Sequence, residues 1–192
     1  ISWFILNNIS KKEVLKWWDI LSSMELRQGL FLTLYLSYND LIKFFLIIMK
    51  SYRAGGIVIN HEGKIALANE HLWGFPRGGV DDGEDYITTA KREVLEEVGL
   101  EEFDTIKELD TYERYPNGIT KDTPGAYPME IHMFLFRTDY NGELHPKDKN
   151  VKDANWFTYE EALERLSNEK DIEFLVNNWE KVQEISSEIK NN

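Results

Sequence analysis

The sequence predicts an α/β fold in which a mixed β-sheet is sandwiched between α-helices. Two observations lead to it. Segments typical of strands and of helices alternate along the chain, but without the regular strand-helix-strand rhythm of a purely parallel sheet. The clearest helical segments are also apolar on one face only, so each can cover one face of a sheet.

The first clear elements form a hairpin. Residues 54–60 are a short apolar run rich in β-branched side chains, and residues 65–69 are a second short run. The four residues between them include Gly63, as turns often do. Gly and Pro punctuate residues 72–85, which predicts a loop.

A helix follows the loop. Asp85 can cap its start, and Gly99 is the residue type that most readily ends a helix in the left-handed conformation. Beyond it, apolar and aromatic runs predict strands at residues 103–109, 112–115 and 131–138, with a turn at Asn141-Gly142.

Two helices are expected at the end of the chain, over residues 160–166 and 171–189. The second carries an apolar face at helical spacing. Its members are Ile172, Leu175, Val176, Trp179, Val182 and Ile185.

Residues 1–48 are predicted to be an N-terminal extension of a domain that covers residues 49–192. An amphipathic helix fits residues 11–26, and the apolar runs at 30–36 and 41–49 are each shorter than the roughly 20 residues that span a bilayer. The sequence starts at Ile1, and Met49 directly precedes the first strand, so a true start at Met49 and a native extension both stay open. A membrane association directed by the extension is a further alternative.

Charge narrows the possible partners. The formal net charge is −12, and residues 49–192 carry 17 Lys and Arg against 30 Asp and Glu. Such an acidic domain repels the phosphate backbone of long DNA or RNA, so a small nucleotide is the expected partner. No membrane partner is expected, and the oligomeric state stays open. The absence of Cys excludes disulfides and thiolate metal sites and agrees with a cytoplasmic location.

One motif carries the chemistry. It runs from Gly78 through Glu84 to the segment Arg92-Glu93-Val94-Leu95-Glu96-Glu97-Val98-Gly99-Leu100. On a helix, Glu93, Glu96 and Glu97 are three and four residues apart, which puts their carboxylates on one face. Another face is apolar, with Ile87, Ala90, Val94 and Val98.

Carboxylates crowded in this way repel one another and require a cation. Carboxylate, carbonyl and water oxygens are the ligands preferred by Mg²⁺ or Mn²⁺, which usually bind through a few carboxylates and the phosphates of the substrate. An isolated Glu pair on a helix is usually only solvated surface. The complete spacing from Gly78 to Leu100 favours a metal site instead.

The motif matches the Nudix box at every position, and the order of elements over residues 51–190 resembles that family. The resemblance implies a Nudix fold and Mg²⁺-dependent hydrolysis of a phosphoanhydride in a nucleoside diphosphate derivative. It also implies roles for single residues. Glu93, Glu96, Glu97 and the carbonyl of Gly78 would bind metal, Glu93 would act as general base or orient it, and Glu84 would pair with Arg92. Glu130 is a candidate for a further ligand outside the box.

The lead-in Trp73 to Gly78 resembles the branch of diadenosine tetraphosphate and diphosphoinositol hydrolases. Arg77 is therefore a candidate phosphate contact, although a loop Arg in solvent is the alternative. Arg53 is a second candidate for substrate binding. A base-stacking Tyr is expected beyond the box, with Tyr115 the candidate beside Tyr112 and Tyr127.

We expect dinucleoside polyphosphates or nucleoside triphosphates, including oxidised ones, as substrates. Two alternatives stay open: an ADP-ribose or sugar-nucleotide pyrophosphatase, and a Nudix-like domain that binds a nucleotide and regulates without turnover. The four His have no metal-ligand spacing, and P-loop and serine-hydrolase motifs are absent.

Overall fold

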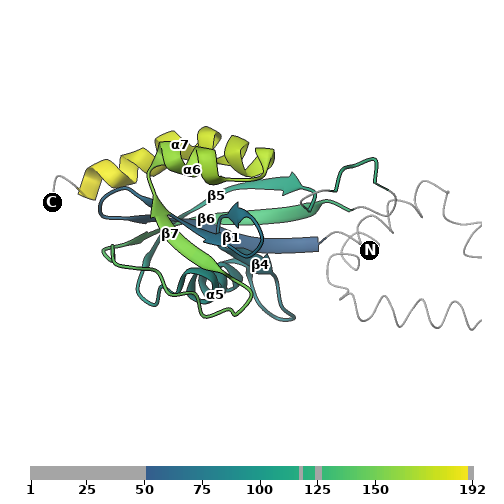
Figure 1. Ribbon diagram of the computed structural model, residues 1–192, viewed down its shortest axis with the longest axis horizontal. Coiled ribbons are helices and arrows are strands. Elements are labelled where there is room, and N and C mark those ends of the chain that lie inside the picture. Colours follow the sequence, from purple (N-terminus) through teal and green to yellow (C-terminus); the bar gives the residue numbers. More distant parts are fainter. Residues whose placement is uncertain (1–50, 117–118, 124–126, 190–192) are drawn as a thin grey trace, which may run out of the picture. The chain divides into compact units, whose positions relative to one another are not determined.

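The computed structural model describes residues 51–116, 119–123 and 127–189, and the side chains of the last helix up to Glu184 (Figure 1). Seven strands lie in this part of the chain: β1 (Ser51–Asn60), β2 (Ile65–Asn69), β3 (Trp73–Gly74), β4 (Arg77–Gly79), β5 (Asp104–Arg114), β6 (Met129–Thr138) and β7 (Asp153–Phe157). Its helices are α5 (Tyr86–Val98), α6 (Tyr159–Arg165) and α7 (Glu169–Ile189). The predicted extension and its helix over residues 11–26 lie outside the described residues.

The strands form one mixed sheet, as predicted. Its central path runs β3-β2-β1-β6-β5, and β4 pairs with β1 while β7 pairs with β2. Strands β1 and β6 are parallel over their whole length, from Ser51 opposite Met129 to Asn60 opposite Thr138. The other pairs are antiparallel.

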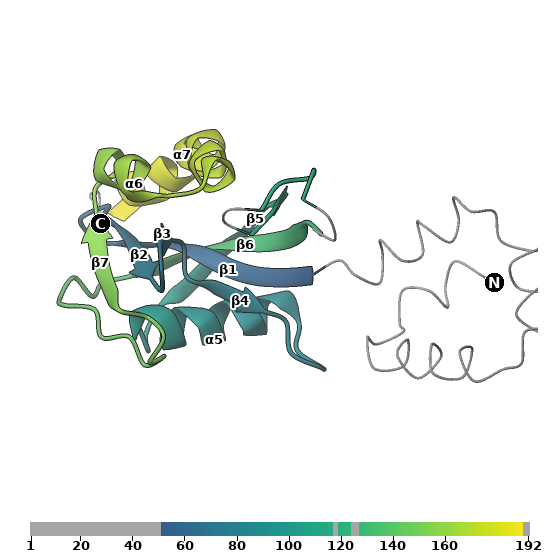
Figure 2. The same ribbon diagram turned by 45° about the vertical axis from the view of Figure 1, so that its right-hand side comes forward.

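Helices cover both faces of this sheet (Figure 2). On one face, α5 buries Ala90, Val94 and Val98 against apolar side chains of β1 and β6. On the other face, α6 and α7 bury a separate cluster that includes Ala162 and Leu175. The predicted sandwich of a mixed sheet between helices is therefore confirmed.

The hairpin and α5 form where their local signals predict. Gly63 adopts a positive φ of 79° in the turn after β1. The side chain of Asp85 accepts a hydrogen bond from the N–H of Thr88 at 2.8 Å, and Gly99 ends the helix with φ 77°. These caps fix both ends of the helix that carries the three carboxylates.

Several boundaries differ from the prediction. The expected loop over residues 72–85 contains the short strands β3 and β4, and the two expected strands at 103–109 and 112–115 are one strand, β5, with two register shifts. Strand β7 was not predicted. Each difference arises because backbone pairing with a neighbouring strand, which is not visible locally, decides the conformation.

The apolar face of α7 is the predicted one except at Val176. Leu175 and Val182 are buried, and Ile172 and Trp179 pack against the same cluster. Val176 is 49% exposed, and Phe174 is buried in its place. Asp171 and Asn178 lie on the same buried face. In the described part of the chain, no helix is both long and apolar enough to span a membrane.

Candidate active site

Two carboxylates of α5 meet β4 at two successive residues. Oε2 of Glu97 accepts a hydrogen bond from the backbone N–H of Arg77 at 3.1 Å. Glu93 lies against Gly78, where an added Cβ would come within 1.9 Å of its Oε1. Only glycine therefore lets β4 approach the carboxylate of Glu93 so closely.

Burial raises the pKa of both groups. For Glu97 the loss of hydration is the largest cause, the charge of Glu93 adds to it, and the Arg77 amide opposes it, so the pKa rises to about 8. Burial likewise raises the pKa of Glu93 against the opposing effect of Arg92. A cation that lies between these carboxylates would therefore relieve an electrostatic cost of the fold.

Arg92 of α5 is hydrogen-bonded to β4 and to the loop between β4 and α5. Its Nε donates to Oε1 of Glu84 at 3.0 Å, and its Nη2 donates to Oε2 of Glu84 and to the carbonyl of Gly79, each at 2.9 Å. Its Nη1 donates to Glu93 and, at 3.2 Å, to Glu96. The hydrogen bonds from Arg92, more than any other cause, lower the pKa of Glu84 to about 2.

A second charged cluster lies buried behind β4. Asp171, in the first turn of α7, accepts from Nη2 of Arg77 at 3.0 Å and from Nη1 of Arg114 at 3.2 Å through its Oδ2. Its Oδ1 accepts from the hydroxyl of Tyr112 at 2.6 Å. Two guanidinium groups thus share one carboxylate, and the cluster is net positive beside Glu97. We call Arg77, Tyr112, Arg114 and Asp171 the Asp171 cluster.

Glycines make room for this arrangement. A Cβ at Gly55 would lie 2.3 Å from the carbonyl oxygen of Pro76 and 2.4 Å from Cβ of Arg77, so a side chain there would push β4 away from β1. A Cβ at Gly74 would lie 3.1 Å from Nη2 of Arg77. The guanidinium of Arg77 passes over Gly74 to reach α7.

The donor set fits Mg²⁺ in kind. Carboxylate and carbonyl oxygens are its usual protein ligands, and water with substrate phosphate fills the remaining positions. Among the described residues, however, no three acidic, His or Cys side chains are already gathered as a chelating group. Glu93 and Glu96 both accept from Arg92 instead. Glu93 and Glu96 would have to turn from Arg92 towards a metal.

Comparison with known proteins agrees with this geometry. A family model described as NUDIX domain matches residues 49–177, two thirds of the chain. The chain belongs to the Nudix family. The RNA pyrophosphohydrolase of Pelagibacter ubique is 33% identical over 112 residues, which are 53% of this chain and 71% of that protein. The RNA pyrophosphohydrolase of Bartonella bacilliformis is 28% identical over 123 residues, which cover 57% of this chain and only 61% of that protein.

The fold is also similar to that of solved structures. A binary complex of the Ap4A hydrolase of C. elegans superposes with a TM-score of 0.54 at 16% identity, covering 74% of this chain and 99% of that one. At this identity the match supports the Nudix fold alone. The sequence prediction of a Nudix hydrolase is confirmed by the family match and by the names of the relatives.

The structure brings the Nudix-box residues together. Gly78, Glu93 and Glu97 meet at β4, and Glu84, Arg92 and Glu96 join them through the guanidinium of Arg92. Their catalytic and metal-binding roles stay predictions.

Arg77 is not a loop residue in solvent. Its side chain is 10% exposed and bound to Asp171, so that alternative is wrong. Its Nη1 has no hydrogen-bond partner among the described residues. A phosphate contact through Nη1 stays a prediction.

The remaining candidate residues differ in burial and in their partners. Tyr112 is stacked on Phe174 with ring centroids 4.6 Å apart and bonded to Asp171, so it is a packing residue and not a platform for a base. Tyr115 and Tyr127 are half-buried. Arg53 is half-buried opposite Gly79, near enough to Glu93 to lower its pKa slightly against the larger effect of burial. Glu130 lies 2.9 Å from Nε2 of His132.

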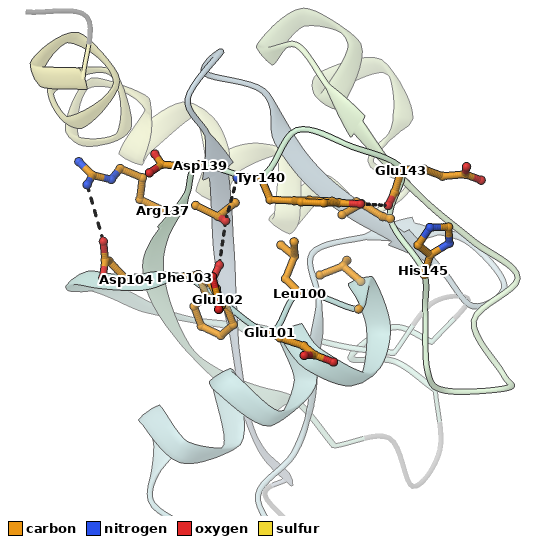
Figure 3. Close-up of a pocket in the computed structure, with 14 residues that line it drawn as sticks. Leu100, Glu101, Glu102, Phe103, Asp104, Arg137, Asp139, Tyr140, Glu143 and His145 are labelled. Atoms are coloured by element: carbon orange, nitrogen blue, oxygen red, sulfur yellow. Dashed lines mark hydrogen bonds and ion pairs between the residues drawn. The ribbon is translucent and has the colours of Figure 1, made fainter. Parts of the chain in front are cut away.

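A pocket of about 840 Å³ lies at the C-terminal end of α5 (Figure 3). It is lined from residues 98–104, 137–140 and 143–145, and Asp104 in its wall pairs with Arg137 at 3.6 Å. None of the Nudix-box carboxylates lines it. Glu93 and Glu97 lie instead against β4, outside the lining of this pocket.

The sequence analysis did not identify Asp171 or Arg114 as parts of the site. One signal existed: Asp171 is four residues before Leu175, which puts a carboxylate on the apolar side of a helix. A buried charge requires a partner. The sequence does not say which of the basic residues supplies it.

Proposed function

We propose that the chain hydrolyses a phosphoanhydride bond in a nucleoside polyphosphate, with Mg²⁺ or Mn²⁺ bound by Glu93, Glu96, Glu97 and the carbonyl of Gly78. The observation that carries the proposal is the meeting of Glu93 and Glu97 with β4. There, two carboxylates whose pKa values are raised by burial lie beside the net positive Asp171 cluster.

Each side chain would have a separate task. The bound cation would lower the pKa of the attacking water and neutralise charge on the phosphates. Glu93, buried and with a raised pKa, would accept or orient the proton of that water. Arg92 would hold Glu84 and so keep the loop before α5 in place.

The cations beside the carboxylates favour a chain of more than two phosphates. Arg77 has one buried guanidinium nitrogen that no described residue contacts by a hydrogen bond, and the half-buried Arg53 lies opposite Gly79. A guanidinium provides a rigid pair of donors for phosphate oxygens. We therefore propose dinucleoside polyphosphates or nucleoside triphosphates as substrates, ahead of ADP-ribose.

The names of the relatives favour a second candidate, the triphosphate at the 5′ end of an RNA. It carries the same polyphosphate chemistry. The 17 basic against 30 acidic residues of residues 49–192 oppose extended contacts with the rest of an RNA. If RNA is a substrate, only its first nucleotides should contribute to KM.

The test compares kcat/KM for diadenosine tetraphosphate, an oxidised dGTP, a short 5′-triphosphorylated RNA and ADP-ribose at equal Mg²⁺. The first three should each exceed ADP-ribose by at least about tenfold, a difference of ~1.4 kcal/mol in the barrier. ADP-ribose as the best substrate would contradict the polyphosphate preference. No turnover of any of the four would favour the regulatory alternative.

Arg77→Ala separates the role of this residue from a general loss. It should lower kcat/KM for the polyphosphates more than for ADP-ribose. The matched control is Arg137→Ala, because Arg137 pairs with Asp104 in the wall of the pocket that no Nudix-box carboxylate lines. Equal loss on all substrates would remove Arg77 from the phosphate site.

A further inference from the structure

We infer that Asp171 is a positioning residue for the proposed metal-binding carboxylates: from the first turn of α7 it holds Arg77, and through Arg77 it fixes β4 against Glu97 and Glu93. The inference deepens the proposed function and rests on it. Nothing in the Nudix box itself points to α7, which lies on the opposite face of the sheet from α5 (Figure 2).

The first step is the completeness of the contacts at Asp171. Its carboxylate is buried, with the side chain 1% exposed, and both oxygens accept from side chains of β4 or β5. Such a group has one favourable orientation, because turning it would leave the buried donors of Arg77, Arg114 and Tyr112 without their acceptor. Asp171 is therefore a rigid anchor.

The second step is the short path from this anchor to the metal-site carboxylates. Nη2 of Arg77 lies 3.0 Å from Oδ2 of Asp171, and the backbone N–H of the same residue donates to Glu97 at 3.1 Å. The next residue, Gly78, is in contact with Glu93. One residue therefore connects the anchor on α7 with two carboxylates of α5.

The third step is that β4 is a short strand at which Arg77 is the residue bound to α7. It is three residues long, and among the described strands it pairs with β1 alone, while Arg92 donates to the carbonyl of Gly79 at its end. At Gly55 and Gly74 the chain leaves just enough room for Arg77 to cross to α7. If Asp171 loses its charge, the buried guanidinium of Arg77 loses its partner, and β4 is expected to shift away from Glu97.

Stability alone is a poor reason for such a cluster. Replacing buried ion pairs by apolar residues of similar volume is often neutral or stabilising, so a pair retained only for stability has no clear advantage. Groups that orient metal ligands, in contrast, typically change metal affinity by about 10–100-fold when altered. The two roles therefore differ in what a substitution does to metal binding.

The experiment measures Mn²⁺ binding to the whole chain without nucleotide, by electron paramagnetic resonance of free Mn²⁺, and kcat with the best substrate of the panel. The variants are Asp171→Asn and, as a matched control, Val182→Ala, which shortens a buried side chain farther along α7. Thermal unfolding curves identify a temperature at which wild type and both variants are folded, and Mn²⁺ binding and kcat are measured there. Leaving out the nucleotide separates positioning from any phosphate contact of Arg77.

Asp171→Asn should raise the Kd for Mn²⁺ by about tenfold or more and lower kcat, while Val182→Ala lowers only the melting temperature. If Asp171→Asn does not fold, Arg77→Lys decides, because it keeps a cation opposite Asp171 but removes the fork; its Kd should rise as well. A Kd within twofold of wild type in the folded variant, or an equal rise in Val182→Ala, overturns the inference.

These results are distinguishable from failure of the proposed function. Wild-type protein that binds Mn²⁺ and hydrolyses substrate, beside an unchanged Asp171→Asn, refutes the positioning role alone. Wild-type protein that binds no Mn²⁺ and hydrolyses nothing refutes both.

Discussion

The guanidinium of Arg92 donates two hydrogen bonds to the carboxylate of Glu84, from Nε to Oε1 at 3.0 Å and from Nη2 to Oε2 at 2.9 Å. The two residues are eight positions apart, one on α5 and one in the loop before it. A planar fork of this kind fixes direction as well as distance. The pair therefore sets how the loop after β4 enters the helix of the carboxylates.

Arg92→Lys should destabilise the protein by about 1–3 kcal/mol, because an ammonium cannot hold Glu84, Gly79 and Glu93 together. Urea unfolding measures the loss. Arg137→Lys is the control, since the half-buried Arg137 pairs at 3.6 Å with an exposed Asp104, and such a surface pair should contribute about 0–1 kcal/mol. Equal losses of unfolding free energy in the two variants would mean that the contacts of Arg92 stabilise the fold no more than the Arg137–Asp104 pair does.

Glu84→Gln should make the protein less sensitive to acid. The pKa of Glu84 is lowered from 4.5 to about 2 in the folded state, so its contribution to stability is present above pH 4.5 and is lost as the pH falls towards 2. Wild type should therefore lose melting temperature more steeply than the variant between these pH values. Thermal unfolding at several pH values gives the two slopes.

Glu101→Gln serves as the reference for that slope. Lys147 lowers the pKa of Glu101 too, but the pair is exposed and is weakened by salt. Its substitution should change the acid slope little in 0.5 M salt, a concentration at which a Debye length is only about 4 Å. If the melting temperature of Glu84→Gln falls with pH as steeply as that of wild type, protonation of Glu84 does not weaken its contact with Arg92, and the prediction is wrong.

Glu97→Gln should abolish most turnover while the fold stays intact or becomes slightly more stable. It removes a proposed metal ligand and a buried carboxylate whose hydration is already lost. We expect kcat to fall by more than about tenfold, or ~1.4 kcal/mol of transition-state stabilisation. Rate assays with circular dichroism check both parts, and the exposed Glu164→Gln is the control. Retention of more than about a tenth of kcat would refute the role of Glu97.

A chain that begins at Met49 should fold and be active. The family match starts at residue 49, and the sheet, its helices and the box all lie between Ser51 and Ile189. Circular dichroism and the rate relative to the 192-residue chain test this. Insoluble or inactive 49–192 beside active 1–192 would mean that the first 48 residues complete the domain.

The box helix could be predicted because its signals are local. A cap at Asp85, an apolar stripe through Val94 and a glycine at 99 lie within one short segment. Strand β7 could not, because its sequence Asp-Ala-Asn-Trp-Phe has little strand preference, and it is extended because five of its residues pair with β2. The same holds for β4, whose pairing with β1 depends on space left by Gly55.

The box residues were also predictable as a set, whereas their support was not. Helical spacing alone puts Glu93, Glu96 and Glu97 on one face. The environment of Arg77 depends on Asp171, which is far along the chain and becomes its neighbour only when α7 packs on the sheet. The helical pattern put Val176 on the apolar face of α7, whereas Phe174 is buried on the same side as Asp171 and Val176 is exposed.

The parallel pairing of β1 with β6 has a consequence for synthesis on the ribosome. Every box residue lies in the segment between these two strands, and α5 packs on apolar side chains of both. When α5 leaves the ribosome, β1 has already emerged, but Phe134 and Phe136 of β6 have not. The helix then lacks the part of its packing surface that β6 supplies. The nascent chain can therefore pack α5, with its three carboxylates, against the complete pair of β1 and β6 only after residue 138 has emerged.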